Sequence, residues 1–513
     1  MTTAPSSSDI RQRRGRWWAF STLVLAVLLI AVDGTVLGMA TPFISEDLAP
    51  TGTQLLWIGD IYSFVLAGLL VTMGSLGDRI GRKKLLLTGA TAFGLFSALT
   101  AYAPTAEALI LGRALLGVAG ATLMPSTLAL IRSLFPDPAE RSTAIGIWAA
   151  ATSGGAAFGP VLGGLLLENF WWGSVFLINV PVMALLLPVG IKLLPESKNP
   201  DPGPWDLPSV GLSMVGMIGV VYAIKETAAH GLSAGTAAAA LVGVFALVLF
   251  VRRQVRLPSP LIDVRLFANR AFSGVIGANL LSVLGMSGLV YFLSQFFQLV
   301  QGYSPFVAGL AELPAVVASM GSGLVAGWLV RRSSVRVVLS GGMATMGGAL
   351  ALLVLLTPDS GYALMAVSLF LVGVGMGLAF AVANDVILSS VPKDQAGAAS
   401  AVSETAYELG MALGIAVLGS IITGVYQRFE VPPGMPAAAV SDARGSLGGA
   451  AEAAAALPAE QAQALLDAAR AAFTTGLASA AAIGALLLLA AAAASWVMLK
   501  NHRPGEGAPS GHG

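Results

Sequence analysis

The sequence contains no cysteine and few histidines. Without cysteine, disulfide bonds, thiolate chemistry and cysteine-ligated metal are excluded. His230, His502 and His512 lie apart in the chain, so they indicate no histidine metal cluster. No nucleotide-binding loop of the form G-x-x-x-x-G-K-[ST] is present, which argues against ATP as an energy source. We also find no catalytic constellation, and therefore expect a protein that is not an enzyme and needs no cofactor.

Charge is scarce as well. Only 11% of the 513 residues are charged, against about 25% in soluble domains. Hydrophobic residues make up 56% of the chain and are arranged in long runs. The net charge of +1, with basic residues in short clusters between those runs, gives no reason to expect a nucleic-acid partner. The composition predicts an all-α polytopic membrane protein.

The apolar runs divide into fourteen segments of the length that crosses a bilayer, about 20 residues each. They lie at 17–39, 54–75, 85–103, 106–131, 142–166, 173–193, 208–226, 233–252, 272–299, 306–330, 335–357, 361–386, 397–426 and 471–499. The first run is long enough to span, contains Asp33 and lacks a convincing cleavage site. We therefore expect an uncleaved first helix rather than a signal peptide.

Basic residues mark the loops of one side. If the N-terminus is inside, nearly all lysines and arginines of the loops fall on the cytoplasmic side. The outer loops hold only Lys225, Arg428, Arg444 and Arg470. This bias predicts that both termini are cytoplasmic. The one long outer loop, 428–470, contains strong helix formers at 457–472, so we expect a helical hairpin over the outer mouth; a flexible alanine-rich linker is the alternative.

Internal repetition predicts two related halves. GSLGDRIGRKKLLLTG (74–89) and GLVAGWLVRRSSVRVVLSGG (323–342) both join spans through a tight basic loop, and GGAAFGPVLGG (154–164) is echoed by GMALGIAVLG (410–419). Two six-helix halves with two inserted helices between them explain these offsets. The predicted divisions are a tail at 1–16, a six-helix bundle at 17–193, a linker with two spans at 194–270, a six-helix bundle at 271–499 and a tail at 500–513.

The loop between the second and third spans carries a motif. Its residues, Gly74, Asp78, Arg79, Gly81, Arg82, Lys83 and Lys84, form the pattern G-x-x-x-D-R-x-G-R-K-K. Gly74 permits close helix approach, Gly81 permits a tight turn, and Asp78 can accept hydrogen bonds from arginine or from a helix N-terminus. The alternative is a basic membrane anchor with an incidental aspartate.

This motif resembles the signature loop of the major facilitator superfamily. The resemblance extends over 17–499 through AVDGTVLGMATPFI (31–44), WIGDIYSFVLAG (57–68), GRALLGVAGATLMP (112–125) and WWGSVFLINVPV (171–182). The pattern G-x-x-x-G-P-x-x-G-G, formed by Gly155, Gly159, Pro160, Gly163 and Gly164, resembles the antiporter motif. Together these are similar to the fourteen-span drug:proton antiporter-2 branch, near the QacA-type exporters. The second half departs from the pattern, because Gly327 stands where the first half has Asp78.

Two glutamates lie in the thirteenth span, where each charge costs about 2.5–3.5 kcal/mol. Glu404 and Glu408 are one turn apart and share a helix face with Tyr407 nearby. Two adjacent carboxylates resist ionising together, so we expect at least one to hold a proton that it exchanges for a cationic drug. Tyr407 could offer its ring to the cation. For either glutamate, a purely structural hydrogen bond is the alternative.

Asp33 and Asp60 form a second candidate set. Trp57 shares a face with Asp60, which gives an aromatic surround suited to a lipophilic cation. Arg113 is the one basic residue deep within a span, so it requires a carboxylate partner, for which we expect Asp33. The resemblance implies proton coupling by Arg113, and coupling and substrate binding by the two aspartates. An interfacial Asp60 and a structural Asp33 salt bridge are the alternatives.

Weaker candidates complete the set. Glu312, before Pro314 in the tenth span, is expected to face the central substrate site, whereas capping explains Asp385 as well as transport does. Gln295 and Gln298 could line the same site, although aromatic packing also explains their segment.

The leading functional prediction is a monomeric bacterial cell-membrane exporter that uses the proton gradient. Its substrates would be small lipophilic cations, such as quaternary ammonium compounds, dyes and antibiotics. The alternatives are a same-fold exporter of one antibiotic or of a lipid, a proton symporter, and a membrane sensor without turnover.

Overall fold

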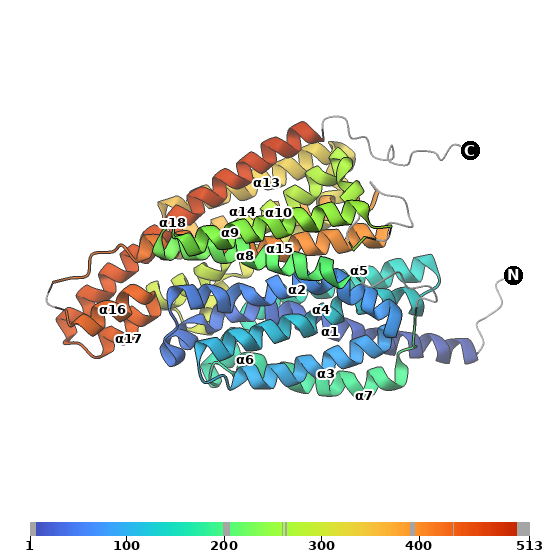
Figure 1. Ribbon diagram of the computed structural model, residues 1–513, viewed down its shortest axis with the longest axis horizontal. Coiled ribbons are helices and arrows are strands. Elements are labelled where there is room, and N and C mark those ends of the chain that lie inside the picture. The colour runs from blue at the N-terminus through green and yellow to red at the C-terminus, as the bar shows by residue number, and fades with distance from the viewer. Residues whose placement is uncertain are drawn as a thin grey trace.

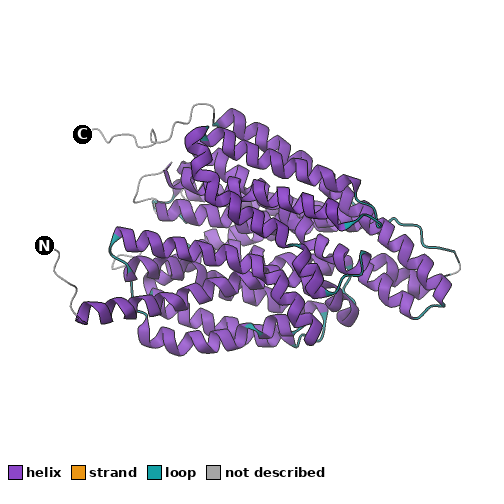
Figure 2. Ribbon diagram, turned by 180° about the vertical axis from the view of Figure 1, so that it is seen from behind, coloured by secondary structure: helices purple, strands orange, loops and turns teal. Residues whose placement is uncertain are grey.

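The computed structural model describes residues 7–198, 206–258, 260–261, 264–389, 396–433 and 435–499. All regular secondary structure in these ranges is helical (Figure 2). Thirteen helical segments of this part are long and apolar enough to cross a membrane. The remaining predicted span, 142–166, lies inside helix α5 (Pro138–Asn169). The prediction of an all-α, multi-pass membrane protein is confirmed.

Residues 7–193 form the first half. Its helices are α1 (Ser7–Leu48), α2 (Gly52–Ile80), α3 (Arg82–Ala101), α4 (Ala106–Leu134), α5, α6 (Ser174–Leu177) and α7 (Asn179–Leu193). In this bundle α1 packs on α5, α2 on α4, and α3 on both α4 and α7. The predicted span 173–193 is broken between α6 and α7, so the sixth membrane segment consists of two consecutive helices.

The second half repeats the same packing order. Its helices are α10 (Arg270–Gln295) with the π-helix η2 (Phe296–Val300), α11 (Pro305–Ala311), α12 (Leu313–Arg332), α13 (Val335–Leu352) with η3 (Leu353–Leu355), α14 (Tyr362–Ser389), α15 (Ala396–Tyr426), α16 (Ala437–Gly445), α17 (Leu447–Ala455) and α18 (Ala459–Met498). Here α10 packs on α15, α12 on α14, and α13 on both α14 and α18. The internal repetition of the sequence therefore corresponds to two halves with equivalent helix neighbours.

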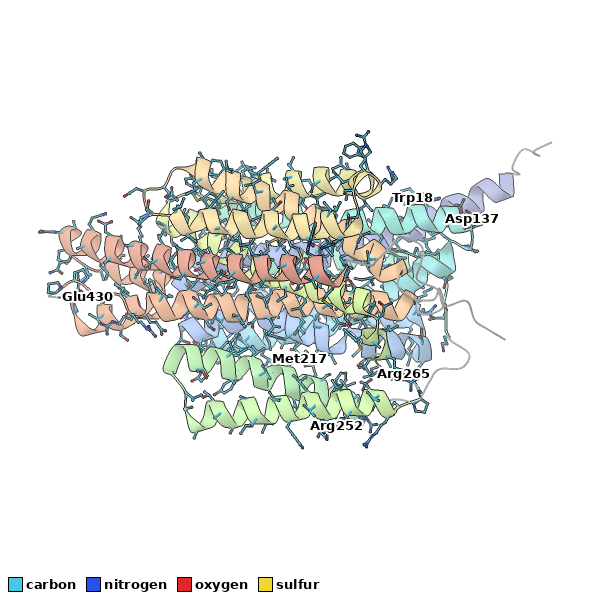
Figure 3. All side chains as sticks on the ribbon, turned by 90° about the horizontal axis from the view of Figure 1, so that it is seen from above. Trp18, Asp137, Met217, Arg252, Arg265 and Glu430 are labelled. Carbon is cyan, nitrogen blue, oxygen red and sulfur yellow. The ribbon has the colours of Figure 1, made fainter. Side chains whose placement is uncertain are left out.

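Two helices and a short 3-10 turn, η1 (Val264–Ala268), connect the halves. Helices α8 (Leu207–His230) and α9 (Ala234–Arg256) pack on each other, with Gly219 against Gly243. Figure 3 shows this pair along one edge of the bundle, where Met217 and Arg252 are labelled. Asp206 caps α8 and accepts hydrogen bonds from Arg253 of α9 at 2.8 and 2.9 Å. Burial opposes ionisation of Asp206, but these bonds lower its pKa below the usual range, which keeps the cap charged.

Helices α16 and α17 project beyond the bundle at the end opposite to the start of α1 and the end of α18 (Figure 1). We call this the hairpin end. The Tyr426 hydroxyl donates to the Ala443 carbonyl at 2.7 Å, which ties α16 to the end of α15. The structure thus has two short helices in the predicted loop 428–470. The helix-forming segment 457–472 is not an arm of this hairpin, because α18 begins at Ala459 and continues through it into the last span.

The halves meet through α1 with α10, α2 with α15, and α5 with α11. Several of these contacts lie toward the hairpin end. A side chain added at Gly52 would lie 2.8 Å from the Thr423 side chain. The Thr41 hydroxyl is 3.0 Å from the Tyr291 hydroxyl. Gln298 donates to the Met39 carbonyl at 3.2 Å, so it bridges the halves rather than standing free in a cavity.

Candidate functional site

Arg113 on α4 lies in the interior of the first half beside Asp33 on α1. Its Nη1 is 3.0 Å from Asp33 Oδ2, and the two side chains are 1% and 0% exposed. The Arg113 Nε also donates to the Ile58 carbonyl at 3.3 Å, and its guanidinium lies 4.7 Å from the Tyr62 ring centre. These contacts compensate a buried cation that would otherwise be very costly.

Asn179 completes the shell of Asp33. Its Nδ2 donates to Asp33 Oδ1 at 2.8 Å and to Ser97 Oγ at 3.0 Å. Asn179 is the first residue of α7, so the break after α6 places its amide at the interior carboxylate. Asn179 is not among the site residues that the sequence motifs predict. A lone asparagine within the apolar stretch VFLINVPV was the available signal.

Asp60 on α2 has a lysine partner that the sequence pattern does not indicate. Lys225, predicted to lie in an outer loop, instead lies on α8, one turn before the helix ends at His230, and its side chain is 0% exposed. Its Nζ is 2.8 and 2.7 Å from the two Asp60 oxygens. The same atom lies 3.8 Å from the Trp57 ring centre. Asp60 is fully buried in the protein, so the alternative of a water-exposed interfacial acid is wrong.

Helix α15 directs its acidic and aromatic side chains to different neighbours. Glu408 is buried and hydrogen-bonds the Ser63 side chain of α2, while its Oε2 has no hydrogen-bond partner within the described residues. Glu404 is partly exposed. Tyr407 packs edge-on against Phe380 of α14, with ring centres 5.4 Å apart. Glu408 is thus the glutamate that reaches the other half.

Glu312 lies at the break between α11 and α12. It is buried, and its Oε1 has no hydrogen-bond partner within the described residues. Gln295 is also buried, and its Nε2 has no partner in the same part of the chain. The side chain of Asp385 lies outside the described residues.

The signature loop forms a compact turn between α2 and α3. Asp78 Oδ1 accepts from Arg82 Nε at 2.9 Å and pairs with Arg82 Nη2 at 2.8 Å.

Gly81 has φ of 111°, a conformation that other residues rarely adopt, and a side chain added there would lie 2.6 Å from Glu196. Glu196 accepts the Lys83 backbone N–H at 3.1 Å. The linker after α7 therefore docks on this loop, a contact that no sequence motif signalled. A side chain added at Gly74 would lie 3.6 Å from Pro125 of α4, and Arg79 lies in the last turn of α2.

The glycines of the antiporter-like motif hold α5 between two helices. Side chains at Gly155, Gly159 and Gly163 would collide with α1 at Leu28, Thr35 and Val36. On another face, a side chain at Gly164 would collide with the Pro305 carbonyl of α11, and one at Gly309 would lie 2.5 Å from the Pro160 carbonyl. The contact is reciprocal, with a proline and a glycine from each half, and it permits no added atom.

Comparisons with known proteins agree with this architecture. The family model described as the Major Facilitator Superfamily matches residues 23–415. The multidrug efflux pump LfrA of Mycolicibacterium smegmatis is 48% identical over 479 residues, covering 93% of this chain and 95% of LfrA. The methyl viologen resistance protein SmvA of Salmonella typhimurium is 40% identical over 467 residues, covering 89% of this chain and 93% of SmvA.

The fold is also found among solved structures. A bacterial homolog of the human lysosomal transporter Spinster superposes with a TM-score of 0.66 at 17% identity, covering 94% of this chain and 97% of that one. The family and its structural neighbours indicate a multi-pass membrane transporter. The match of the family model and the two similar efflux proteins establish that this chain belongs to the major facilitator superfamily.

Proposed function

We propose that the chain is a proton-coupled antiporter that exports lipophilic cations across the bacterial cytoplasmic membrane. The observation that carries the proposal is the Asp60 site, where a buried carboxylate and the Trp57 ring together surround a positive charge. A carboxylate beside an aromatic face is the chemistry that binds an organic cation. The multidrug and methyl viologen names of the relatives support this reading, because methyl viologen is an organic dication.

Proton coupling is assigned to the other acids that were predicted to take part in it. One Glu408 oxygen has no hydrogen-bond partner in the part of the chain that the structure describes, and Glu408 faces the opposite half through Ser63. A proton can therefore bind there without breaking an ion pair with any described residue. Glu404 lies one turn away and disfavours a second negative charge. Asp33 is held by Arg113, and its release depends on relative movement of α1 and α4. Tyr407 and Glu312 are assigned to the substrate path.

Transport would proceed by rocking of the two halves. The reciprocal contact of α5 with α11 and the bridges near Thr41 and Gln298 lie on the side of the hairpin end. We assign this end to the outside and both termini to the cytoplasm, following the basic loops. The conformation described here is then the one closed toward the outside.

Everted membrane vesicles test the function directly. Addition of ethidium or benzalkonium to energised vesicles should release protons with the wild-type chain. Glu408→Gln should abolish the proton release caused by at least a dication such as methyl viologen, while leaving expression intact. Glu460→Gln, the same change at an exposed position of α18, is the matched control and should behave as wild type. No proton release with any cation would refute antiport.

A resistance profile in a pump-deficient bacterial host separates the main alternative. Protection against many unrelated cations supports multidrug export. Protection against a single neutral antibiotic would instead favour a dedicated exporter and would contradict the role of Asp60 as a cation site.

A further inference from the structure

The inserted helix α8 brings a cation into the proposed drug site. Lys225 Nζ contacts both carboxylate oxygens of Asp60, at 2.7 and 2.8 Å, and lies 3.8 Å from the Trp57 ring centre. No surface of the lysine or aspartate side chain is exposed. Lys225 therefore makes the contacts, carboxylate and indole face, that an organic cation would make.

The position of Lys225 depends on packing between three helices. Helix α8 contacts α2 of the first half and α15 of the second. Phe64 of α2, Val221 of α8, and Ala412 and Ala416 of α15 form one small buried cluster. Lys225 is four residues after Val221, so the same face of α8 that packs on the cluster carries the lysine. Neither six-helix half supplies this cation.

One carboxylate cannot hold two cations at this distance without strong repulsion between them. At 3–4 Å, two like charges in a buried site repel far more strongly than in water. An incoming drug that binds Asp60 and Trp57 must therefore move Lys225 away. Lysine suits this exchange, because its ammonium is a point charge on a flexible stem, whereas arginine grips a carboxylate through two parallel hydrogen bonds.

We infer that Lys225 is a tethered cation that occupies the drug site when it is empty and that a cationic substrate must displace. This inference rests on the proposed export of cations and adds a specificity-determining residue to it. A tethered group competes at an effective concentration that can reach the millimolar range. Lys225 therefore excludes small, weakly held ammonium ions and admits larger aromatic or quaternary cations, which gain more contact with Trp57.

Equilibrium binding of radiolabelled tetraphenylphosphonium to the purified full-length protein tests the inference. Lys225→Met removes the competitor and should lower the Kd by about tenfold or more. This gain should disappear in the Lys225→Met/Asp60→Asn double variant, because the carboxylate that binds the drug is gone. Lys192→Met, at an exposed position of α7, is the matched control and should leave the Kd unchanged.

Lys225→Arg provides a second test that keeps the buried charge and therefore the fold. The guanidinium should be harder to displace, so the Kd should rise while the thermal transition stays near that of wild type. If Lys225→Met is folded and binds no tighter than wild type, the inference is overturned. It is equally overturned if Lys225→Arg is folded and binds as tightly as wild type or more tightly.

The binding measurement needs no proton gradient, so it fails independently of antiport. If proton release in vesicles is absent but the Kd changes in the Lys225 variants are as expected, the coupling mechanism is refuted and the inference about Lys225 is still supported. Normal proton-coupled export with unchanged binding in both lysine variants would refute only the tethered cation.

Discussion

Replacing Gly309 by alanine probes whether the contact of α5 with α11 closes the hairpin end. The added methyl group would lie 2.5 Å from the Pro160 carbonyl oxygen, 2.8 Å from its carbon and 3.0 Å from Val161 Cα. All three neighbours are backbone atoms, so the helices must separate. Overpacking of this kind costs about 1–3 kcal/mol. The intrinsic gain of alanine over glycine in a helix applies to every conformation and cancels from the comparison.

The cost applies only to the conformation in which α5 and α11 touch. A penalty of about 1–3 kcal/mol shifts the ratio of closed to open molecules by about 5- to 150-fold. The chain has no cysteine, so a single Thr41→Cys substitution gives a labelling site without background. Thr41 is 1% exposed in the closed conformation, at the contact between the halves. A water-soluble maleimide should therefore label Thr41→Cys faster in Gly309→Ala, within that range.

Gly321→Ala is the matched control, because a methyl group at this position of α12 meets no atom within 4 Å. It should leave the labelling rate unchanged. The reasoning is refuted if Gly309→Ala and Gly321→Ala label equally while both keep the wild-type thermal transition.

Three further substitutions test individual contacts. Arg113→Met leaves Asp33 buried without its cation, which costs about 3–5 kcal/mol. A thermal-shift measurement in detergent should therefore show a large destabilisation, and a transition within about two degrees of wild type would contradict the buried pair. Asn179→Leu removes the 2.8 Å hydrogen bond to Asp33 at a cost of about 1–3 kcal/mol. It should weaken proton-coupled export more than it lowers expression, and unchanged export would show that Asn179 has no role in coupling. Tyr426→Phe removes the hydrogen bond to the Ala443 carbonyl, which is worth about 1 kcal/mol. Proteolysis of the hairpin should become faster, with little effect on the bundle. Equal cleavage rates in the variant and the wild type would show that this bond does not hold α16.

The fold could be predicted to a large extent because membrane spans are long and their composition is distinctive. Hydropathy and the repeated basic loops were sufficient for the two halves and the inserted pair. The partner of Arg113 was also predictable, because a single buried cation needs an acid and Asp33 lies at a similar depth. The interruptions before Asn179 and at Glu312 were not predicted, because each lies inside a segment that is apolar enough to count as one continuous span.

Lys225 shows where prediction from loop charges fails. The predicted seventh span ended at 226, which left the lysine at its margin, and the positive-inside rule then counted it as an outer loop residue. The helix continues to His230, so the lysine lies inside the protein and faces Asp60. Its role depends on packing between α8 and α2, which are more than a hundred residues apart in the chain. The spacing of residues in the sequence does not predict the contact between α8 and α2.

The inserted pair is joined to its surroundings in two unlike ways. Its contact with α2 includes the directional ion pair of Lys225 and Asp60 beside apolar packing on Phe64. Its contact with α15, at Ala412 and Ala416, is apolar. When the halves rock, we expect the apolar surfaces of α8 and α15 to slide and the Lys225–Asp60 ion pair to hold. In the empty transporter, α8 and α9 would therefore move with the first half. Once a drug takes the place of the lysine, the ion pair is lost and the Phe64 contact with α2 is apolar like the contact with α15, so α8 can move with either half.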